Sequence, residues 1–573
     1  MNRIAAIALM SGVAGLACGR DYPDFIIHNA VVYTLAWDDP SRDGTPAANA
    51  PVENGRWVAN STAVAVTGGL VSFVGSDGEV LALAGSDTQV LDAGGHYLVP
   101  GFVDSHAHPN ELKPRALRVD LEGVLTEDEV LRRVTERVRE TPPAEWVLGG
   151  GWDEGAWANQ LPDKNRLSRA TPDNPVILFS LHGFAAWSNQ RALDETGITA
   201  DTPDPVGGTI VRGADGVPTG LFLNNATDVL KDAMPPKTLD DHVAEAAFGL
   251  ETMARSGYTG LHHAGVYLDH HRAYLALDDS NALPIRVYGM IAATDTVLMD
   301  EVRQAGPTFD PGRRYQFRAV KAYYDGSLGV RGARLLDDYS DRPGHRGVSG
   351  ADYGFDQERV ADMMAAGFQV GIHAIGDAGN RETLEFFERV YAEHPEVRAH
   401  RNRVEHAQVV HPDDFSRFAA LDLIASMEPP HMAEDKTWAE DRLGPERVRG
   451  AYAWRTFRQH GVGLTFNSDL TGSDYNIFYG LYAAVSRTSK DGEPAGGWYA
   501  AQAMTPEEAL RAYTVWSARA GHLDAHVGTI EVGKFADLTL VDVDVLNVAT
   551  PSALLAGTVL LTVVGGEVVY DGR

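Results

Sequence analysis

The chain has 573 residues, of which 44% are hydrophobic and 22% charged, an ordinary composition for a globular protein with a large core. Its formal net charge of −30 is spread along the sequence and contains no basic tract. Such a field repels nucleic acid and anionic membrane surfaces, so nucleic acid is excluded as a partner.

The first 18 residues have the features of an export leader. Arg3 precedes a short apolar run that lacks the roughly 20 apolar residues of a membrane span, and no twin arginine is present. Cys18 resembles the lipidated cysteine of a bacterial lipoprotein, although Gly15 stands where a large aliphatic residue is usual. We expect a bacterial protein that is exported, either periplasmic or attached to the cell envelope through a lipid on Cys18. The alternatives are ordinary signal cleavage and a plain hydrophobic leader. Because Cys18 is the only cysteine of the sequence, an intramolecular disulfide and a four-cysteine zinc site are excluded.

Both ends of the remaining chain, residues 19–94 and 525–573, have the pattern of short β-strands. Runs such as DFIIHNAVVYTL near the start and LLTVVGGEVVYDGR near the end are apolar or β-branched and are separated by Asn, Gly and Asp turns. Neither end clusters the residue types used in catalysis. We therefore predict one small β-sandwich domain, structural in role, built from both chain ends.

The stretch YLVPGFVDSHAHP, residues 97–109, is an apolar run that ends in two histidines. Side chains two positions apart in a strand point to the same side, so His106 and His108 would face one point, as a metal ion requires. The alternative is a pair of exposed loop histidines.

Between residues 95 and 524, strand-like runs alternate with helical ones, which predicts βα units and a parallel sheet. Besides the histidine strand, seven strands are placed at residues 257–266, 283–291, 317–326, 368–377, 401–408, 421–429 and 462–469. Eight strands close a TIM-type barrel, whose active sites lie at the carboxyl ends of the strands. The predicted fold class is therefore α/β, a (β/α)8 barrel with an insertion after its first strand.

That insertion, residues 110–253, contains a helical segment (TEDEVLRRVTERVRE), a strand (NPVILFSLH) and a glycine-punctuated hairpin. Trp152, Trp157 and Trp187 surround His182 in the sequence. We expect the insertion to lie over the barrel mouth and to supply a wall for a partly apolar substrate. The alternative is an accessory domain whose tryptophans pack its own core.

Residues that can hold a metal ion stand at the ends of the predicted barrel strands: His106, His108, Lys321, His373, His406 and Asp469. Imidazole and carboxylate ligands suit zinc and similar divalent ions, with a position left open for water. An ammonium group cannot bind a cation, but a lysine carbamylated by carbon dioxide is an anion that can bridge two metal ions. The charge of Lys321 would be costly at the end of an apolar strand without a partner. The alternative is an unmodified Lys321 paired with Asp325.

In this order the motifs VPGFVDSHAHP, VKAYYDGSLG, IHAIGDAGNRETL, RVEHAQ, SMEPPHMAEDKTW and LTFNSD make the chain resemble the amidohydrolase superfamily. The match is to its amidohydrolase family 3 branch, which includes YtcJ-like hydrolases and formamide deformylases, and it runs from about residue 25 to the C-terminus. The resemblance implies that His106 and His108 hold one metal ion from the first strand, and that Lys321 is the bridging ligand. It assigns His373 and His406 to the fifth and sixth strands and Asp469 to the eighth.

Several positions depart from the pattern of the resembled family. Glu428 stands where glutamine is usual and is expected to add negative charge near the mouth; His263 replaces a common aspartate, and Asn224 a common glutamate. Asn467 stands in place of the usual glycine two residues before the catalytic aspartate. These changes leave the metal set intact and bear on substrate specificity.

The resemblance implies a metal-dependent hydrolase that cleaves a non-peptide carbon–nitrogen bond in a small amide, formamide or cyclic amide, with two zinc ions and a carbamylated Lys321. Asp469 would accept a proton from the activated water and pass it to the leaving group. His182 would donate to the substrate carbonyl, and Trp152, Glu428 and His431 would contact the substrate. The alternatives are an ester, carbamate or lactone hydrolase on the same metals, and a non-catalytic binding protein. The family also makes a homodimer an expectation.

Overall fold

The structure, a computed structural model, describes residues 22–59, 61–152, 162–180, 185–205, 208–224, 226–234, 236–329, 331–348 and 350–573. The chain forms two compact units. The barrel unit comprises the described residues up to His108 together with Leu250–His271 and Leu277–Arg573. The insertion unit comprises Pro109–Gly249 and Arg272–Ala276.

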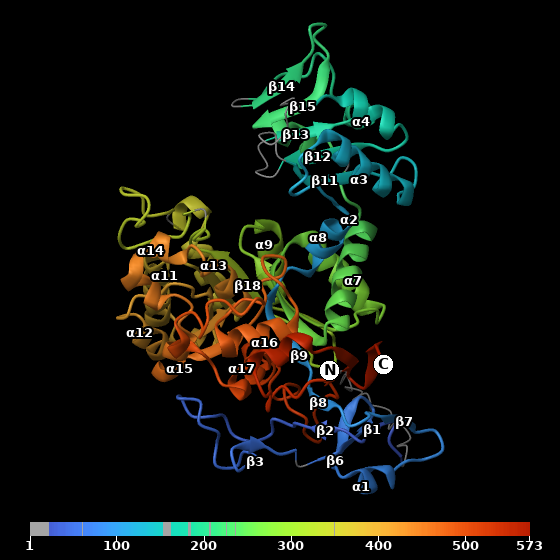
Figure 1. The fold of residues 1–573 in the computed structure, drawn as a ribbon. Helices are drawn as coiled ribbons and strands as arrows, with labels where there is room; N and C mark the ends of the chain where they lie inside the picture. The colour runs from blue at the N-terminus through green and yellow to red at the C-terminus, as the bar shows by residue number, and fades with distance from the viewer. Residues whose placement is uncertain are drawn as a thin grey trace, which may run out of the picture. The chain divides into compact units, whose positions relative to one another are not determined.

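Eight parallel strands form the central sheet of the barrel unit, in the spatial order β22-β21-β20-β19-β18-β17-β16-β9. Figure 1 labels two of them, β9 and β18. The strands are β9 (Phe102–Ala107), β16 (Tyr258–Val266), β17 (Arg286–Ala292), β18 (Tyr315–Tyr323), β19 (Gln369–Ala374), β20 (Arg403–His406), β21 (Ile424–Met427) and β22 (Gly463–Phe466). All eight predicted strands are present, and the prediction of a TIM-type barrel is confirmed.

The barrel closes between β9 and β22, where side chains and single backbone contacts replace a regular ladder. The Ser105 hydroxyl donates to the Phe466 carbonyl at 3.0 Å, and the His108 amide donates to the Leu470 carbonyl at 2.6 Å. An isolated parallel bridge joins Ala107 to Leu470. This seam brings the end of the first strand beside the end of the eighth.

Helices between and beyond the barrel strands complete the unit, apart from residues 272–276 of the first helix, which belong to the insertion unit. They are α8 (Leu268–Asp279), α9 (Thr296–Ala305), α10 (Gln357–Ala365), α11 (Asp377–Glu393), α12 (Phe415–Ala420), α13 (Pro429–Asp435), α14 (Ala439–Arg447), α15 (Trp454–His460), α16 (Ile477–Ser486), α17 (Pro506–Ala512) and α18 (Val515–Ala520). Several begin with a side-chain cap; Thr505, for example, accepts from the Glu508 amide at the start of α17. In the described residues, no helix combines the length and apolar character needed to cross a membrane.

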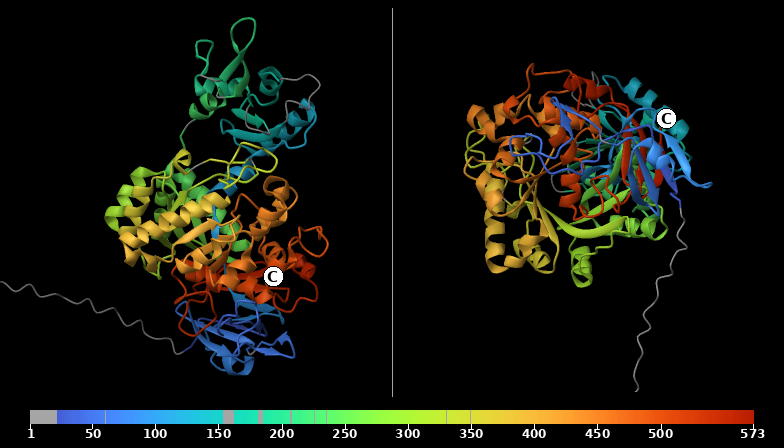
Figure 2. Two further views of the ribbon diagram at one scale, coloured as in Figure 1. Left: turned by 90° about the vertical axis from the view of Figure 1, so that its left-hand side faces the viewer. Right: turned by 90° about the horizontal axis from the view of Figure 1, so that it is seen from below.

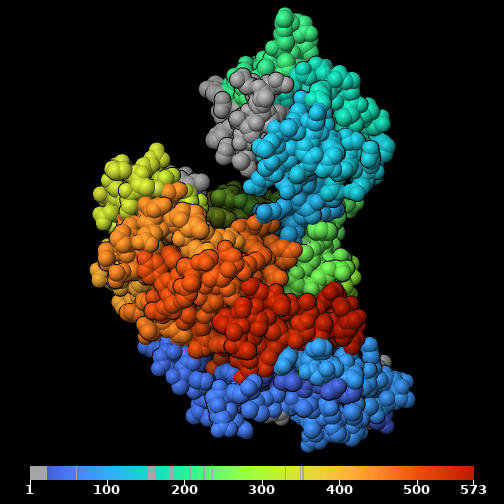
Figure 3. Space-filling model, viewed as in Figure 1, coloured from blue at the N-terminus to red at the C-terminus, as the bar shows by residue number. Residues whose placement is uncertain are grey.

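Two further sheets of the barrel unit join the chain ends, as expected from their β-rich sequences. One has the order β6-β5-β1-β7 and the other β2-β8-β23-β24-β25, and the N- and C-terminal segments lie side by side in all views (Figures 1, 2 and 3). Ile27, Val64, Leu540 and Val563 belong to one buried cluster, so both ends share a core. The strands are β1 (Phe25–His28), β2 (Val31–Val32), β5 (Ala63–Thr67), β6 (Leu70–Gly75), β7 (Gln89–Asp92), β8 (Tyr97–Pro100), β23 (Leu538–Val541), β24 (Val559–Val564) and β25 (Glu567–Asp571), with helix α1 (Asp77–Leu81) and the small hairpin β3 (Val52–Glu53) and β4 (Arg56–Trp57).

The insertion unit has a six-stranded sheet in the order β10-β11-β12-β13-β15-β14. Its elements are β10 (Val119–Asp120), β11 (Val147–Trp152), β12 (Val176–Ser180), β13 (Ala185–Ser188), β14 (Gly208–Arg212), β15 (Pro218–Asn224), α2 (Leu112–Leu117), α3 (Glu127–Glu140), α4 (Lys164–Ala170), α5 (Gln190–Thr196), α6 (Ala226–Asp232) and most of α7 (Leu239–Arg255). The predicted helix, strand and hairpin are found here as α3, β12 and β14–β15. That this unit lies over the barrel mouth stays a prediction.

Candidate metal centre

Six predicted metal ligands meet in one cavity of about 340 Å³ in the barrel unit. Each stands at or near the carboxyl end of a barrel strand, where parallel strands bring their last side chains together. They are His106 from β9, His108 directly after β9, Lys321 from β18, His373 from β19, His406 from β20, and Asp469 after β22. The sequence prediction that these residues converge is therefore correct.

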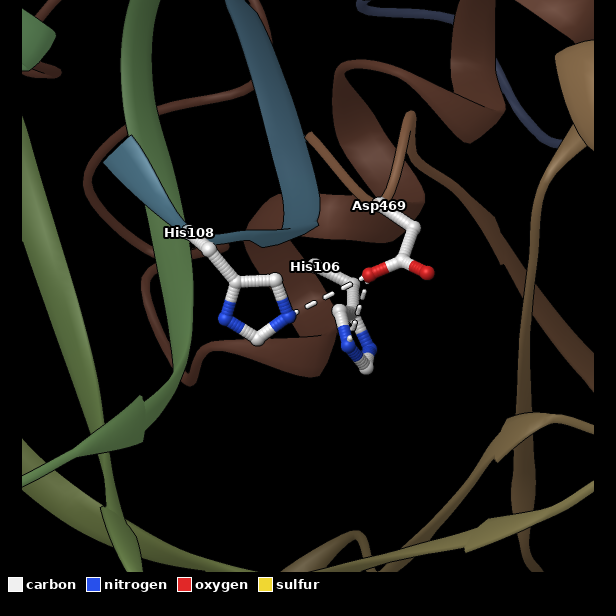
Figure 4. A group of neighbouring side chains, drawn as sticks. All are labelled: His106, His108 and Asp469. Atoms are coloured by element: carbon white, nitrogen blue, oxygen red, sulfur yellow. Dashed lines mark ion pairs between the residues drawn. The ribbon is translucent and has the colours of Figure 1, made fainter. Parts of the chain in front are cut away.

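One carboxylate oxygen of Asp469 faces the rings of both His106 and His108 (Figure 4). One of its carboxylate oxygens, Oδ1, is 3.4 Å from His106 Nε2 and 3.2 Å from His108 Nε2. Burial by itself raises the pKa of Asp469, but the hydrogen bond from His108 and the charges of His106 and His406 bring it well below its usual value. Asp469 is therefore an anion beside two imidazole nitrogens, a donor set that suits a divalent metal ion.

Asp469 also belongs to a second group of potential ligands. The first group consists of His106, His108 and Asp469, and the second of His406, His431 and Asp469. Each residue offers one ligand atom, and within each group these atoms lie within 4.8 Å of one another. The two groups share Asp469. This arrangement fits two neighbouring metal ions.

His373 lies beside the second group, with its ring centroid 4.4 Å from that of His406. Its Nε2 atom is buried without a hydrogen-bond partner among the described residues, 3.6 Å from an oxygen of Asp325. Burial lowers the pKa of His373 well below its usual value, so its ring is neutral and can offer a lone pair. An unsatisfied buried nitrogen of this kind is costly unless it binds a ligand, and it fits a metal site.

Lys321 points into the same cavity and is 1% exposed. Its Nζ donates to His106 Nε2 at 3.0 Å and lies 4.7 Å from the centre of the Tyr323 ring. Burial lowers the pKa of Lys321 to about 8. The structure does not support the alternative pairing with Asp325, whose carboxylate instead accepts backbone N–H groups of Arg334, Ile375 and Gly376.

The backbone at two of the ligands is strained. His406 has φ +69° and Asp469 has φ +46°, in the left-handed region that non-glycine residues rarely occupy. Such strain costs about 1–3 kcal/mol per residue and gathers at functional sites. Asp104 helps to hold the turn at Asp469. Its carboxylate accepts hydrogen bonds from the hydroxyl of Ser468 at 2.6 Å and from the backbone N–H of Ser468 at 3.3 Å.

Two buried carboxylates that contact ligand histidines were not predicted in that role. Glu405 Oε2 is 2.7 Å from His106 Nδ1, and Glu428 Oε2 is 3.2 Å from His406 Nδ1. The available signal for Glu405 was an acidic residue in a predicted barrel strand, directly before His406. Glu428 was expected to add negative charge near the mouth; it directly follows β21, is 1% exposed and contacts His406 and His431, which line the cavity.

Of the predicted substrate contacts, His431 lines the cavity. Burial lowers its pKa, but the hydrogen bond and charge of Glu428 outweigh this effect and raise it to about 9. The prediction that Trp152 contacts the substrate is wrong. Trp152 has no exposed surface, lies in the core of the insertion unit and donates its ring N–H to the Leu178 carbonyl. The accessory-core alternative therefore holds for Trp152. His182 and Trp157 lie outside the described residues.

The rest of the cavity wall combines apolar and acidic side chains. Tyr323, Leu328, Ile375 and Trp438 supply aromatic and aliphatic surface. Gln408, Glu434 and Asp435 supply polar groups, with Asp435 accepting from the amide of Gln408 at 3.2 Å. The aromatic surface beside the metal ligands thus comes, among the described residues, from Tyr323 on β18 and Trp438 before α14.

A sequence profile of the amidohydrolase family matches residues 89–570. Protein LONG AFTER FAR-RED 3 of Arabidopsis thaliana is 32% identical over 88% of this chain and 88% of its own length. The putative amidohydrolase YtcJ of Bacillus subtilis is 30% identical over 89% of this chain and 96% of its own. N-substituted formamide deformylase of Arthrobacter pascens is 28% identical over 89% of this chain and 95% of its own length.

Solved structures share the fold. An uncharacterized metal-dependent hydrolase from Pyrococcus horikoshii superposes with a TM-score of 0.73 at 24% identity, covering 92% of this chain and 99% of its own. A mutant of atrazine chlorohydrolase TrzN from Arthrobacter aurescens, complexed with zinc and atraton, gives a TM-score of 0.52 at 14% identity, covering 96% and 95%.

Proposed function

Since the chain belongs to the amidohydrolase family, whose members are metal-dependent hydrolases, we propose that it cleaves a carbon–nitrogen bond other than a peptide bond in a small amide, formamide or cyclic amide. The observation that carries the proposal is the convergence of six potential ligands from five strand ends in one cavity. The activity named for the formamide deformylase relative supports the choice of bond.

We further propose that the predicted ligands would hold two zinc ions in two groups, with His106 and His108 in one, His373 and His406 in the other, and Asp469 shared between them. The zinc named with the TrzN neighbour supports this choice of metal. When bound, a divalent ion supplies Lewis-acid chemistry: it lowers the pKa of water toward about 7 and polarises a carbonyl oxygen.

Lys321 is proposed to bridge the two groups as a carbamate. Its lowered pKa gives Lys321 a larger fraction of neutral amine near neutral pH than an ordinary lysine has, and the nitrogen of that neutral amine can bond to the carbon of carbon dioxide with loss of one proton. The product is an anion, which removes the cost of a buried ammonium and supplies two oxygen ligands.

The proton transfers are assigned to this chain's own residues. Asp469, an anion at the centre of the ligand set, accepts the proton of the attacking water and returns it to the leaving nitrogen. His431 carries a raised pKa in the same cavity and donates a hydrogen bond to the substrate carbonyl; His182 remains proposed for the same task. Tyr323 and Trp438 bind the apolar part of the substrate.

The test compares amides and esters with the same acyl group, including N-substituted formamides that carry aromatic and aliphatic substituents. We expect amide or formamide hydrolysis that is lost on chelation and restored by zinc. Hydrolysis of the esters alone, with no amide turnover, would refute the carbon–nitrogen assignment and support the ester alternative on the same site.

A further inference from the structure

A charged pair lies inside the barrel beneath the metal ligands. Arg403 and Glu405 occupy alternate positions of β20, point to the same side of the strand and are both 0% exposed. Neither belongs to the predicted ligand set. A buried ion pair is poor evidence for stability, because apolar residues of the same volume often stabilise a core equally well. The pair therefore calls for another explanation.

The guanidinium of Arg403 contacts Glu405 and groups on two other barrel strands. Its Nε lies 2.7 Å from Glu405 Oε1, and its Nη2 donates to Glu405 Oε2 at 2.8 Å. The same Nη2 donates to the backbone carbonyl of Ser105 at 2.6 Å, directly before His106 in β9. Its Nη1 donates to His262 Nδ1 at 2.7 Å, since a guanidinium can only donate. Arg403 thereby connects strand β20 with β9 and β16.

Glu405 connects this network to the ring of His106. An ionised carboxylate is an acceptor only, so His106 Nδ1 carries the proton and donates to Glu405 Oε2 at 2.7 Å. The other ring nitrogen, Nε2, then carries the lone pair, and it is the atom that faces Lys321 and Asp469 in the cavity. The tautomer that can bind metal is thus the one that Glu405 selects.

We propose that Arg403 and Glu405 form a positioning pair that fixes both the backbone and the tautomer of His106 as a metal ligand. The guanidinium holds the carbonyl before His106 and also holds the carboxylate that orients its ring. Both restraints act on one ligand and come from one side chain. This inference rests on the metal-dependent function proposed above and adds the residues that prepare its first ligand.

The decisive variant is Glu405→Gln, which keeps the shape of the side chain and removes its charge. The amide oxygen turns toward the fixed donors of Arg403, so the amide NH2 faces His106 Nδ1. That nitrogen must then accept, its proton moves to Nε2, and the lone pair that faces the cavity is lost. We expect metal affinity to fall about 10- to 100-fold, the usual effect of removing a residue that orients a ligand.

The matched control is Glu508→Gln. Glu508 is also 0% exposed and paired with an arginine, with Arg455 Nη1 donating to it at 2.7 Å, and its remaining contacts are with Arg458 and Thr505. We expect the control to lower the stability of the metal-free protein and leave zinc affinity unchanged. A third variant, Arg403→Lys, replaces the guanidinium by a single ammonium that cannot bond to the Ser105 carbonyl and the Glu405 carboxylate at the same time. We expect it to lower metal affinity less than Glu405→Gln does.

Zinc and cobalt affinities are measured on chelator-stripped full-length protein, with the visible absorption spectrum of the cobalt form and the melting temperature of the metal-free form. Weakened binding and an altered cobalt spectrum in Glu405→Gln, absent in Glu508→Gln, support the proposal. Wild-type affinity and spectrum in Glu405→Gln would overturn the positioning role alone. A wild-type protein that binds neither metal would overturn the metal site, and the positioning pair with it.

Discussion

Replacing Lys321 by methionine should stabilise the metal-free protein, although it removes a residue of the site. The fall in the pKa of Lys321 from 10.5 to about 8 on burial corresponds to roughly 3 kcal/mol, at about 1.4 kcal/mol per pKa unit. Below pH 8 the lysine is charged in both the folded and the unfolded state, and the folded protein bears this full cost. Methionine has a similar volume and no charge to desolvate.

The sign of the pH dependence follows from proton binding. Because the pKa of Lys321 is lower in the folded state, the unfolded chain binds more protons between about pH 8 and pH 10.5. The free energy of unfolding of the wild type therefore increases relative to that of the variant as pH rises through this window. The stabilisation by Lys321→Met is expected to be roughly 3 kcal/mol at pH 7 and close to zero above pH 10.5.

Guanidinium chloride unfolding in the presence of chelator, followed by tryptophan fluorescence at pH 7, 9 and 10.5, measures this difference. Lys490→Met is the control, since that ammonium is 57% exposed and pairs with Asp474 at the surface. Its effect should stay within about 1 kcal/mol at every pH. A Lys321→Met protein that is less stable than wild type at pH 7, or a difference independent of pH, would refute the reasoning.

Three further substitutions test other parts of the account. In metal-free protein, His431→Asn should lower the free energy of unfolding most below pH 6.5 and not at all above about pH 9. The reason is that Glu428 outweighs burial and raises the pKa of His431 to about 9. Denaturant titrations that show the same difference between variant and wild type at every pH would contradict this. Asp469→Asn should lower kcat by about 10²- to 10⁴-fold at matched metal content, the usual contribution of a proton-transfer group, and an unchanged kcat would remove Asp469 from that role. Trp152→Phe should destabilise the protein by about 1–3 kcal/mol through the lost hydrogen bond to Leu178, with KM unchanged; a raised KM at unchanged stability would restore Trp152 as a substrate contact.

The barrel and its ligand set could be predicted because both follow from local patterns. Apolar runs of strand length alternate with helical segments, and the histidines stand where those runs end. Since parallel strands carry their last side chains to one edge, the positions of His106, His373 and His406 in the sequence were enough to bring them together. The joining of the two chain ends followed from their shared β-rich pattern.

The partners of the ligands could not be predicted, because they depend on contacts between distant strands. Lys321 lies within β18, whereas Asp325 follows the strand and its carboxylate accepts backbone N–H groups from later segments, so their closeness in the sequence was misleading. The contact between Glu405 and His106 crosses the interior of the barrel. Nothing in the pattern around Glu428 showed that its carboxylate would contact His406 and His431.

The same limit applies to Trp152. A tryptophan among glycines is compatible with both a ligand wall and a core, and only the packing of β11 against its neighbours decides between them. That packing places Trp152 beside Leu178 in the core of the insertion unit.

The most direct test of the central claim is the metal content of protein purified without chelator, measured together with its hydrolytic activity before and after metal removal. We expect about two divalent ions per chain, an intact mass raised by about 44 Da from carbon dioxide on Lys321, and activity that disappears with the metal and returns with zinc. Protein that contains no metal and gains no hydrolytic rate on addition of zinc or manganese would contradict the assignment of a metal-dependent hydrolase.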